Sequence, residues 1–278
     1  RCDKIKWAVL DSGIDGSHPA FRDENGQSRI EKAFDFSNIR KIVSLDNQNA
    51  NSSAFKSRLC ELMEGKDFDE KEGRKILMQL GKDAAAGRPI HWGLVERFIS
   101  VDPLKPPHKS THGTHVAGII GAAAQRRPKP KNSENEKPSE DEVLYANGMC
   151  PDIKLYDFRV LAKSLVETEF AIIAALQYVR YLNERQAHLN IQGANLSLSI
   201  PHDVRNFACG RTPICNECER LVESGVVVVA AAGNFVKAAA SLEVAIGARS
   251  ASPRVWPESA AIAVSRPAKA SRWCSSTA

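Results

Sequence analysis

The sequence has no apolar run long enough to cross a membrane and no basic run that would mark a nucleic-acid site. Its longest apolar stretches, such as residues 226–232, are far too short to span a bilayer. Lysine and arginine residues are scattered among acidic ones without interleaved aromatic side chains, although the formal net charge is +5. We therefore expect neither a membrane span nor a nucleic-acid partner.

The chain also lacks a dense cysteine framework. Its seven cysteines, an odd number at loose spacings, favour a reducing compartment. Only Cys209, Cys215 and Cys218 are clustered, and a zinc site there would need a fourth ligand, for which His202 is nearest. Because one Cys-x-x-Cys pair without a second is a weak metal signal, we favour a loop with two thiols that leads into a helix around residues 217–223.

No methionine and no signal-peptide pattern opens the chain at Arg1. A strand-like segment, residues 5–10, follows almost at once. We expect an upstream portion to be absent, and the N-terminus predicts no cellular location.

Strand and helix patterns alternate along most of the chain. In chain order, they cover residues 5–10 (strand), 114–124 (helix), 148–161 (strand), 167–185 (helix), 193–200 (strand), 215–225 (helix) and 226–234 (strand). Continuous apolar strands that alternate with helices are typical of a parallel sheet covered on both faces. The predicted fold class is therefore α/β, with a three-layer parallel-sheet core in one domain over residues 1–237.

Two long stretches interrupt this alternation. Residues 38–108 contain apolar residues at spacings of three and four, which predict helices within 53–65 and 73–85 and a third within 91–101. We interpret this region as a helical insertion, because its ends must return to neighbouring strands. Residues 126–142 hold five basic side chains, five acidic side chains and three prolines, which predicts a disordered surface loop.

Three polar residues lie where functional residues of parallel-sheet proteins usually occur, near the carboxyl ends of the strands. Asp11 and Asn234 each follow a predicted strand, at its carboxyl end. His112 opens a predicted helix, where the positive end of the helix dipole favours a neutral imidazole that can accept a proton. A nearby carboxylate would hold the tautomer of that histidine, and the amide of Asn234 could donate to a developing oxyanion.

These stretches resemble the motifs of the subtilisin-like serine peptidases (subtilases, peptidase S8). The segment Asp11-Ser12-Gly13-Ile14 is similar to the family's Asp motif, and residues 112–118, HGTHVAG, match its His motif at every position. Ala232-Gly233-Asn234 resembles the oxyanion motif, and the order Asp, His, Asn agrees with the family, in which Ser comes last. The resemblance implies a subtilisin-like fold and a serine-type endopeptidase that acts on polypeptides.

The resemblance also implies the role of each site residue. His112 would be the general base, Asp11 would orient it, Asn234 would stabilise the oxyanion, and His115 would be a buried, hydrogen-bonded support. The segment that resembles the edge strand pairing with substrate comprises Asn195, Leu196, Ser197, Leu198 and Ser199. Calcium is common in the family, but no carboxylate cluster here stands out as its site. No cofactor is required for the implied reaction.

Other interpretations of the same residues remain open. Asp11 could simply form a turn, as Asp-Ser-Gly often does, and Asn234 could be a turn residue. His112 and His115 could bind zinc together with the cysteine cluster. The His-Glu-x-x-His spacing of a zinc hydrolase is absent, however, and so is an obvious acidic base. We therefore predict no metal at the site.

The family's nucleophile motif is missing from this sequence. No Gly-Thr-Ser-Met-Ala-like turn follows Asn234, and residues 238–278 form an atypical tail with twelve Ala, eight Ser and a single glycine, Gly247. Ser276, in the terminal SSTA, is only a faint echo of that turn. The abrupt change of composition leads us to expect a truncation or frame change near residues 236–247.

The predicted function is accordingly a serine-type endopeptidase by family that is inactive, or nearly so, in this chain. The alternative is a non-catalytic peptide-binding or regulatory module, in which residues 196–199 capture an extended peptide by strand addition.

Overall fold

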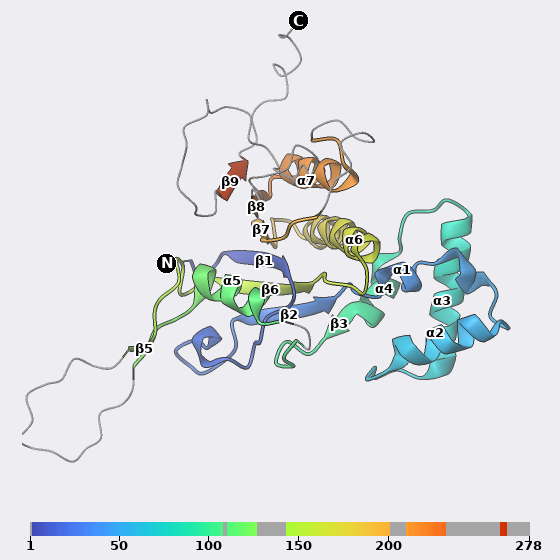
Figure 1. Cartoon of the computed structure of the whole chain (residues 1–278), viewed down its shortest axis with the longest axis horizontal. Helices are drawn as coiled ribbons and strands as arrows, with labels where there is room; N and C mark the ends of the chain where they lie inside the picture. The colour runs from blue at the N-terminus through green and yellow to red at the C-terminus, as the bar shows by residue number, and fades with distance from the viewer. Residues whose placement is uncertain (1, 108–109, 127–142, 201–209, 232–261, 266–278) are drawn as a thin grey trace, which may run out of the picture.

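The computed structural model describes residues 2–107, 110–126, 143–200, 210–231 and 262–265 (Figure 1). For residues 125–126, 143–145 and 262–265 only the backbone is described. The main sheet has seven strands, which lie in the order β3 (Ser100–Val101), β2 (Ile30–Asp35), β6 (Lys154–Arg159), β1 (Lys6–Asp11), β7 (Gly193–Leu196), β8 (Val227–Ala231) and β9 (Ile262–Ser265).

The centre of this sheet is parallel. Strands β2, β6, β1, β7 and β8 pair in parallel, and the two outer strands, β3 and β9, pair antiparallel to their neighbours. The predicted α/β class is confirmed, with antiparallel strands added at both edges. Strand β9 lies within the predicted atypical tail, so part of that tail extends the sheet beyond β8.

Seven α-helices accompany the sheet in the described part of the chain. They are α1 (Ile39–Ile42), α2 (Ser53–Met63), α3 (Glu70–Ala85), α4 (Trp92–Ile99), α5 (His112–Gly121), α6 (Leu165–Glu184) and α7 (Pro213–Glu223). The shorter elements are the 3-10 turns η1 (Pro19–Phe21) and η2 (Leu45–Gln48) and the antiparallel pair β4 (Gln125–Arg126) and β5 (Val143–Tyr145). Residues 127–142, where we predicted a disordered loop, lie outside the described residues.

Alternation along the strands divides the core into two layers. On β1, Ala8 and Leu10 join the larger apolar cluster with α6, whereas Val9 faces the opposite side, where it packs with Ala117 of α5. A strand side chain points to alternate faces at successive residues, so β1 supplies both layers. Helices α6 and α7 thus cover one face of the sheet, and α5 covers the other (Figure 1).

The region predicted as a helical insertion contains α1 to α4. The helices predicted within 53–65 and 73–85 are confirmed, whereas the third ends at Ile99 and gives way to β3. Apolar residues of these helices, such as Phe55, Leu77 and Val95, belong to the same buried cluster as α6 and the sheet.

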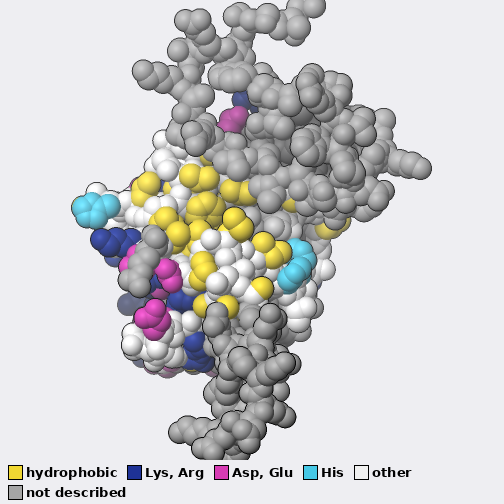
Figure 2. All heavy atoms as spheres, turned by 90° about the vertical axis from the view of Figure 1, so that its left-hand side faces the viewer, with side chains coloured by type: hydrophobic (Ala, Val, Ile, Leu, Met, Phe, Trp, Pro, Cys, Tyr) yellow, Lys and Arg dark blue, Asp and Glu magenta, His cyan; other side chains and the backbone are white. Residues whose placement is uncertain are grey.

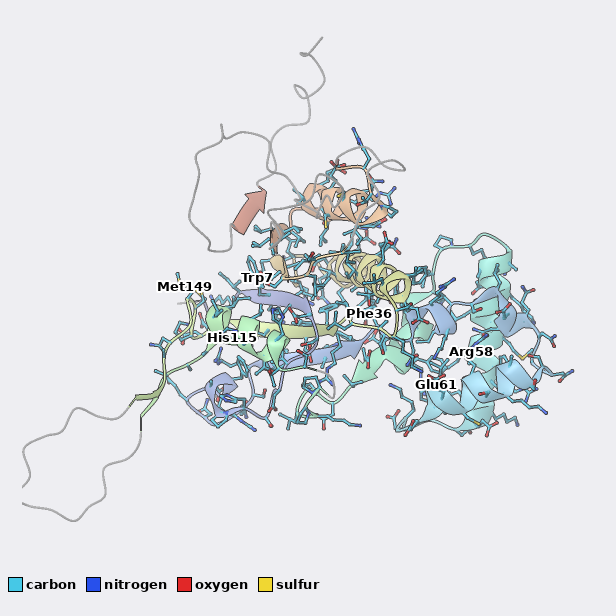
Figure 3. The ribbon with its side chains drawn as sticks, in the orientation of Figure 1. Trp7, Phe36, Arg58, Glu61, His115 and Met149 are labelled. Carbon is cyan, nitrogen blue, oxygen red and sulfur yellow. The ribbon has the colours of Figure 1, made fainter. Side chains whose placement is uncertain are left out.

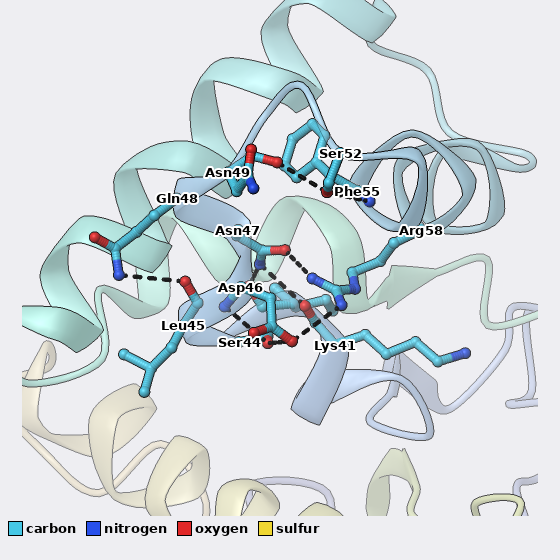
Figure 4. Close-up of polar contacts among 11 residues, drawn as sticks. Lys41, Ser44, Leu45, Asp46, Asn47, Gln48, Asn49, Ser52, Phe55 and Arg58 are labelled. Atoms are coloured by element: carbon cyan, nitrogen blue, oxygen red, sulfur yellow. Dashed lines mark hydrogen bonds and ion pairs between the residues drawn. The ribbon is translucent and has the colours of Figure 1, made fainter.

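A fully buried asparagine connects η2 with the end of α1 and with α2 at the start of this region. Asn47 of η2 donates through Nδ2 to the carbonyl oxygens of Lys41 and Ile42, at 3.0 and 2.8 Å (Figure 4). Its Oδ1 accepts from Arg58 of α2 at 2.6 Å. Because a buried amide without partners is costly, these three bonds explain why a polar side chain occupies this position. Within the described residues, none of the helices is long and apolar enough to cross a membrane.

Candidate active site

Asp11 ends strand β1 and is almost completely buried, with 1% of its surface exposed. Strands β6 and β7 pair with β1 on its two sides, so the carboxylate stands at the carboxyl edge of the parallel sheet. Its Oδ1 accepts a hydrogen bond from the backbone N–H of Ser12 at 2.6 Å. This bond fixes the carboxylate at the start of the turn that follows the strand.

His112 is the first residue of α5 and lies against that carboxylate. Its Nδ1 is 2.8 Å from Asp11 Oδ1 and 3.0 Å from Oδ2. The imidazole is about half exposed, at 53%, and no described residue bonds its other nitrogen, Nε2. When Nδ1–H donates to this carboxylate, the other nitrogen of the neutral ring, Nε2, has no proton and can accept one.

Serine hydroxyls from two separate segments cap the N-terminus of α5. The helix cap, Thr111, makes no side-chain capping bond. Instead, Ser12 Oγ accepts from Gly113 N at 3.0 Å and Ser110 Oγ accepts from His112 N at 3.1 Å. Ser12 Oγ in turn donates to the carbonyl of Ser110 at 3.2 Å. The first free N–H groups of a helix need such partners, and here they join the Asp11 turn directly to the His112 helix.

Two glycines permit the close approach of turn and helix. Gly13 has a φ of +113°, and a Cβ on it would lie 2.7 Å from Pro107 Cβ. A Cβ on Gly113 would lie 2.5 Å from the carbonyl oxygen of Gly13. A side chain at Gly113 would push α5 away from the turn, and one at Gly13 would push the turn away from the segment that leads to α5.

Thr114 adds a contact that the sequence did not predict. Its Oγ1 accepts from the backbone N–H of Asp15 at 2.9 Å. The hydroxyl therefore holds the far end of the 11–15 turn against the first turn of α5. Ser12 and Thr114 lie within the Asp and His motifs and Ser110 lies just before the second one, and this was the only sequence signal for their roles.

The family model of the subtilases, peptidase S8, matches residues 3–275. The chain belongs to the subtilase family. Subtilisin DY of Bacillus licheniformis is 30% identical to it over 123 residues, which are 44% of this chain and 34% of subtilisin DY. The chain thus spans about a third of the length of this curated relative.

Two solved structures show weaker overall similarity. The CspB protease of Clostridium perfringens has a TM-score of 0.41 and 19% identity, covering 83% of this chain and 35% of that one. A psychrophilic protease, S41, has a TM-score of 0.41 and 18% identity, covering 83% of this chain and 46% of that one.

The structure corrects the prediction for His115 of this subtilase. We expected a buried support, but its side chain is exposed on the outer side of α5 (Figure 3). Gly113, Ala117 and Gly121, at a spacing of four, form the buried side of the helix, and His115 lies two residues from that row. It is therefore not the buried support that we predicted.

Apolar side chains accompany His115 on this outer surface. Ile119 and Met149 are 57% and 84% exposed, and Met149 N donates to the carbonyl of Ile119 at 3.0 Å. Figure 2 shows hydrophobic side chains gathered on the face that looks out from this end of the molecule, with histidines at its margins. No group of three His, Cys, Asp or Glu residues that could hold a metal ion occurs among the described residues. Among the described residues there is thus no ligand cluster of this kind for calcium or zinc.

The predicted edge position of the substrate segment is also corrected, whereas the role of residues 195–199 in substrate binding stays a prediction. Strand β7 ends at Leu196 and lies between β1 and β8, so it is an interior strand and not an edge. Asn195 pairs in register with Val9 and Val229 and donates through Nδ2 to Ser197 Oγ at 3.0 Å. Only residues 197–199 continue beyond the strand. Because Leu10 pairs with Leu196, they leave the sheet at the level of Asp11.

The remaining predicted residues are placed only in part. Strand β8 ends at Ala231, at the same edge of the sheet as Asp11. Asn234 and Ser276 lie outside the described residues, so their roles stay predictions.

The cysteine cluster is likewise described in part, since Cys209 and His202 fall outside the described residues. Cys215 and Cys218 are buried free thiols within α7, which agrees with the helix predicted over residues 215–225. Burial raises the pKa of Cys218 well above that of an exposed thiol.

Proposed function

We propose that this chain carries the Asp–His half of a serine-type endopeptidase site. The observation that supports it is the contact of His112 Nδ1 with both oxygens of the buried Asp11 carboxylate. Asp11 holds the imidazole in the tautomer that leaves Nε2 free. His112 would take the proton of an attacking serine hydroxyl and return it to the leaving amine. Asn234 would donate its amide to the oxyanion of the tetrahedral intermediate.

The chain as given is expected to hydrolyse peptide bonds very slowly. Its sequence holds no Gly-Thr-Ser-Met-Ala-like turn after Asn234 that would supply the serine. Without a nucleophile no acyl-enzyme forms, and only binding and oxyanion stabilisation remain. In serine peptidases these residual effects amount to about a thousandfold over water, against a loss of about a millionfold for a missing triad member.

A fluorophosphonate probe tests this proposal, because it reacts with a serine only when a working base activates it. We expect the unmodified chain to be labelled no more than its His112→Ala variant. Labelling that disappears in His112→Ala would contradict the inactivity, and peptide mapping would then identify the nucleophile, with Ser276 as the first candidate. The sequence of the flanking gene, read in all frames, would show whether a Gly-Thr-Ser turn is encoded nearby.

Peptide binding without hydrolysis is the competing function. Residues 197–199 leave the sheet beside Asp11, where an extended peptide could lie along them. Binding of a fluorescent peptide library would be measured by anisotropy in parallel with its hydrolysis. Saturable binding in the absence of turnover would favour the binding module over the peptidase.

A further inference from the structure

Two charged residues of β6 are buried beneath the candidate site and take no part in the contacts described so far. Asp157 is completely buried, and Arg159 is 8% exposed. Side chains two residues apart on a strand share a face, and Leu155, on the same face, packs with Val9 and Ala117 in the layer of α5. Asp157 and Arg159 therefore lie in the layer that holds Asp11.

Asp157 has one strong partner. Its Oδ2 accepts from Arg159 Nε at 2.8 Å, while its Oδ1 is buried without a hydrogen bond. Burial raises the pKa of Asp157 to about 6 against the lowering effects of Arg159 and of the Ile14 backbone, and Asp35 of β2 adds to the rise. An incompletely paired carboxylate in the interior is costly, and an apolar residue would be cheaper there. We therefore look for a role of Asp157 other than stabilising the fold.

Arg159 connects that carboxylate to the two segments that carry the Asp–His contact. Its Nη2 donates to the carbonyl of Lys105 at 2.7 Å, in the segment that leads to α5 and His112. The methylene groups of its side chain lie where a Cβ on Gly13 would be 3.0 and 3.1 Å away. The residue thus contacts both the turn after Asp11 and the approach to the helix of His112.

The backbone register places Arg159 level with the site. Arg159 pairs with Asp11 across β1 and β6, and Val160 N donates to the carbonyl of Asp11 at 2.9 Å. A fork-shaped guanidinium held by Asp157 has little freedom to rotate, so its position fixes the surface on which the Gly13 turn rests.

We propose that Asp157 and Arg159 are positioning residues that hold the Asp11 turn and the Lys105 segment in the register that lets Asp11 meet His112. The inference rests on the proposed function, because it assigns these residues to the same site. They touch neither substrate nor reacting atoms. Arg159 acts through the turn and the segment that it contacts, and Asp157 acts through Arg159.

The test is the downfield proton resonance of His112 Nδ1–H. A proton held between an imidazole nitrogen and a carboxylate is strongly deshielded and protected from exchange, so its signal reports the Asp11–His112 contact without any need for hydrolysis. Proton spectra would be recorded for the unmodified chain and for the Asp157→Asn and Arg159→Lys variants. The Asp11→Asn variant assigns the signal by abolishing it.

Arg29→Lys is the matched control. Arg29 is as buried as Arg159, at 6%, and donates to the carbonyls of Ala20, Gly121 and Ile153, at the opposite end of α5. Its loss should reduce the melting temperature without affecting the resonance. We expect the resonance to be lost in Asp157→Asn and Arg159→Lys and kept in Arg29→Lys, with unchanged circular dichroism in all three.

The outcomes separate this inference from the function on which it rests. An unchanged resonance in folded Asp157→Asn and Arg159→Lys would overturn the inference alone, as would its loss in Arg29→Lys. No resonance in the unmodified chain would overturn the proposed Asp–His contact and this inference together. If Asp157→Asn did not fold, Arg159→Lys, which keeps the charge that faces Asp157, would decide the matter.

Discussion

At its carboxyl end, strand β6 carries opposite kinds of side chain on its two faces. Toward α6 it presents Phe158, which packs on Phe34 and on Tyr178 with ring centroids 5.4 and 6.3 Å apart. Toward α5, its residues on either side of Phe158 are Asp157 and Arg159. Neighbouring residues of this strand therefore contribute to two different layers, an apolar one beside α6 and a more polar one beside α5.

In this subtilase, one layer provides most of the stability and the other fixes the geometry of the candidate site. The α6 layer buries large apolar and aromatic area, which is the main favourable term in folding. The α5 layer contains short polar links, such as Ser12 to Gly113, that contribute modestly to stability but fix the positions of Asp11 and His112. Substitutions in the two layers should therefore have different signatures.

The largest effect is expected in the apolar layer. Phe158→Ala removes a fully buried ring and should lower the free energy of unfolding by about 3 to 5 kcal/mol. Urea denaturation measures this loss, and the downfield resonance of His112 should persist wherever the variant is folded. Met149→Ala, at a residue that is 84% exposed, is the control and should change stability by less than about 0.5 kcal/mol. A resonance lost in folded Phe158→Ala would show that the two layers are not separable.

The next effect comes from the charge in the polar layer. Asp157 has its pKa raised to about 6 in the folded chain, so the folded state binds this proton more tightly than the unfolded state does. Its contribution to stability is full below the unfolded pKa and is lost as the pH rises through about 6. Two pKa units correspond to about 3 kcal/mol.

Denaturation of the unmodified chain and of Asp157→Asn at a series of pH values isolates this contribution. The stability of the unmodified chain relative to the variant should fall between about pH 4 and pH 7. Glu61 has the opposite sign, because its hydrogen bond from Lys41 lowers its pKa, and it is common to both proteins and cancels in the difference. A pH-independent difference would contradict the raised pKa of Asp157 in the folded chain.

The sequence predicts the central elements of this molecule well, for a physical reason. The apolar strands and the alternating helices follow from local periodicity, and the Asp11 and His112 motifs are contiguous, so their chemistry can be recognised without the fold. Sheet order is not local. Strands β7 and β1 pair although they lie far apart in the sequence, and nothing in residues 193–199 distinguishes an interior strand from an edge.

The incorrect and missed residues of the site share a cause. Helix α5 has mainly glycine and alanine near the sheet, so its hydrophobic pattern does not show which side is buried, and the prediction of a buried His115 is wrong. Asp157 and Arg159 alternate with Phe158, a pattern that normally marks a solvent-exposed strand face. Their burial depends on α5 and the Gly13 turn, which arrive from distant parts of the chain.

A third prediction uses two glycines of the same helix. Gly113→Ala would place a Cβ 2.5 Å from the carbonyl oxygen of Gly13, and separating the helix from the turn should cost about 1 to 3 kcal/mol and abolish the His112 resonance. Gly118→Ala meets nothing within 4 Å and should stabilise the chain by about 0.5 to 1 kcal/mol through helix propensity. Thermal unfolding measures both changes. Equal effects at the two positions would refute the close contact of helix and turn.

The smallest effect distinguishes one hydrogen bond within the polar layer. Thr114→Val keeps the shape of the side chain but removes the acceptor for Asp15 N–H, which should cost about 1 kcal/mol and speed amide exchange at Asp15. Thr114→Ser keeps the hydroxyl and loses only a methyl group, so exchange at Asp15 should remain slow. Because Thr114 contacts the end of the turn and not Asp11 itself, the His112 resonance should survive in both variants. If it disappeared in Thr114→Val alone, the whole 11–15 turn would have to act as one rigid unit, and the division of roles between Arg159 and Thr114 would be wrong.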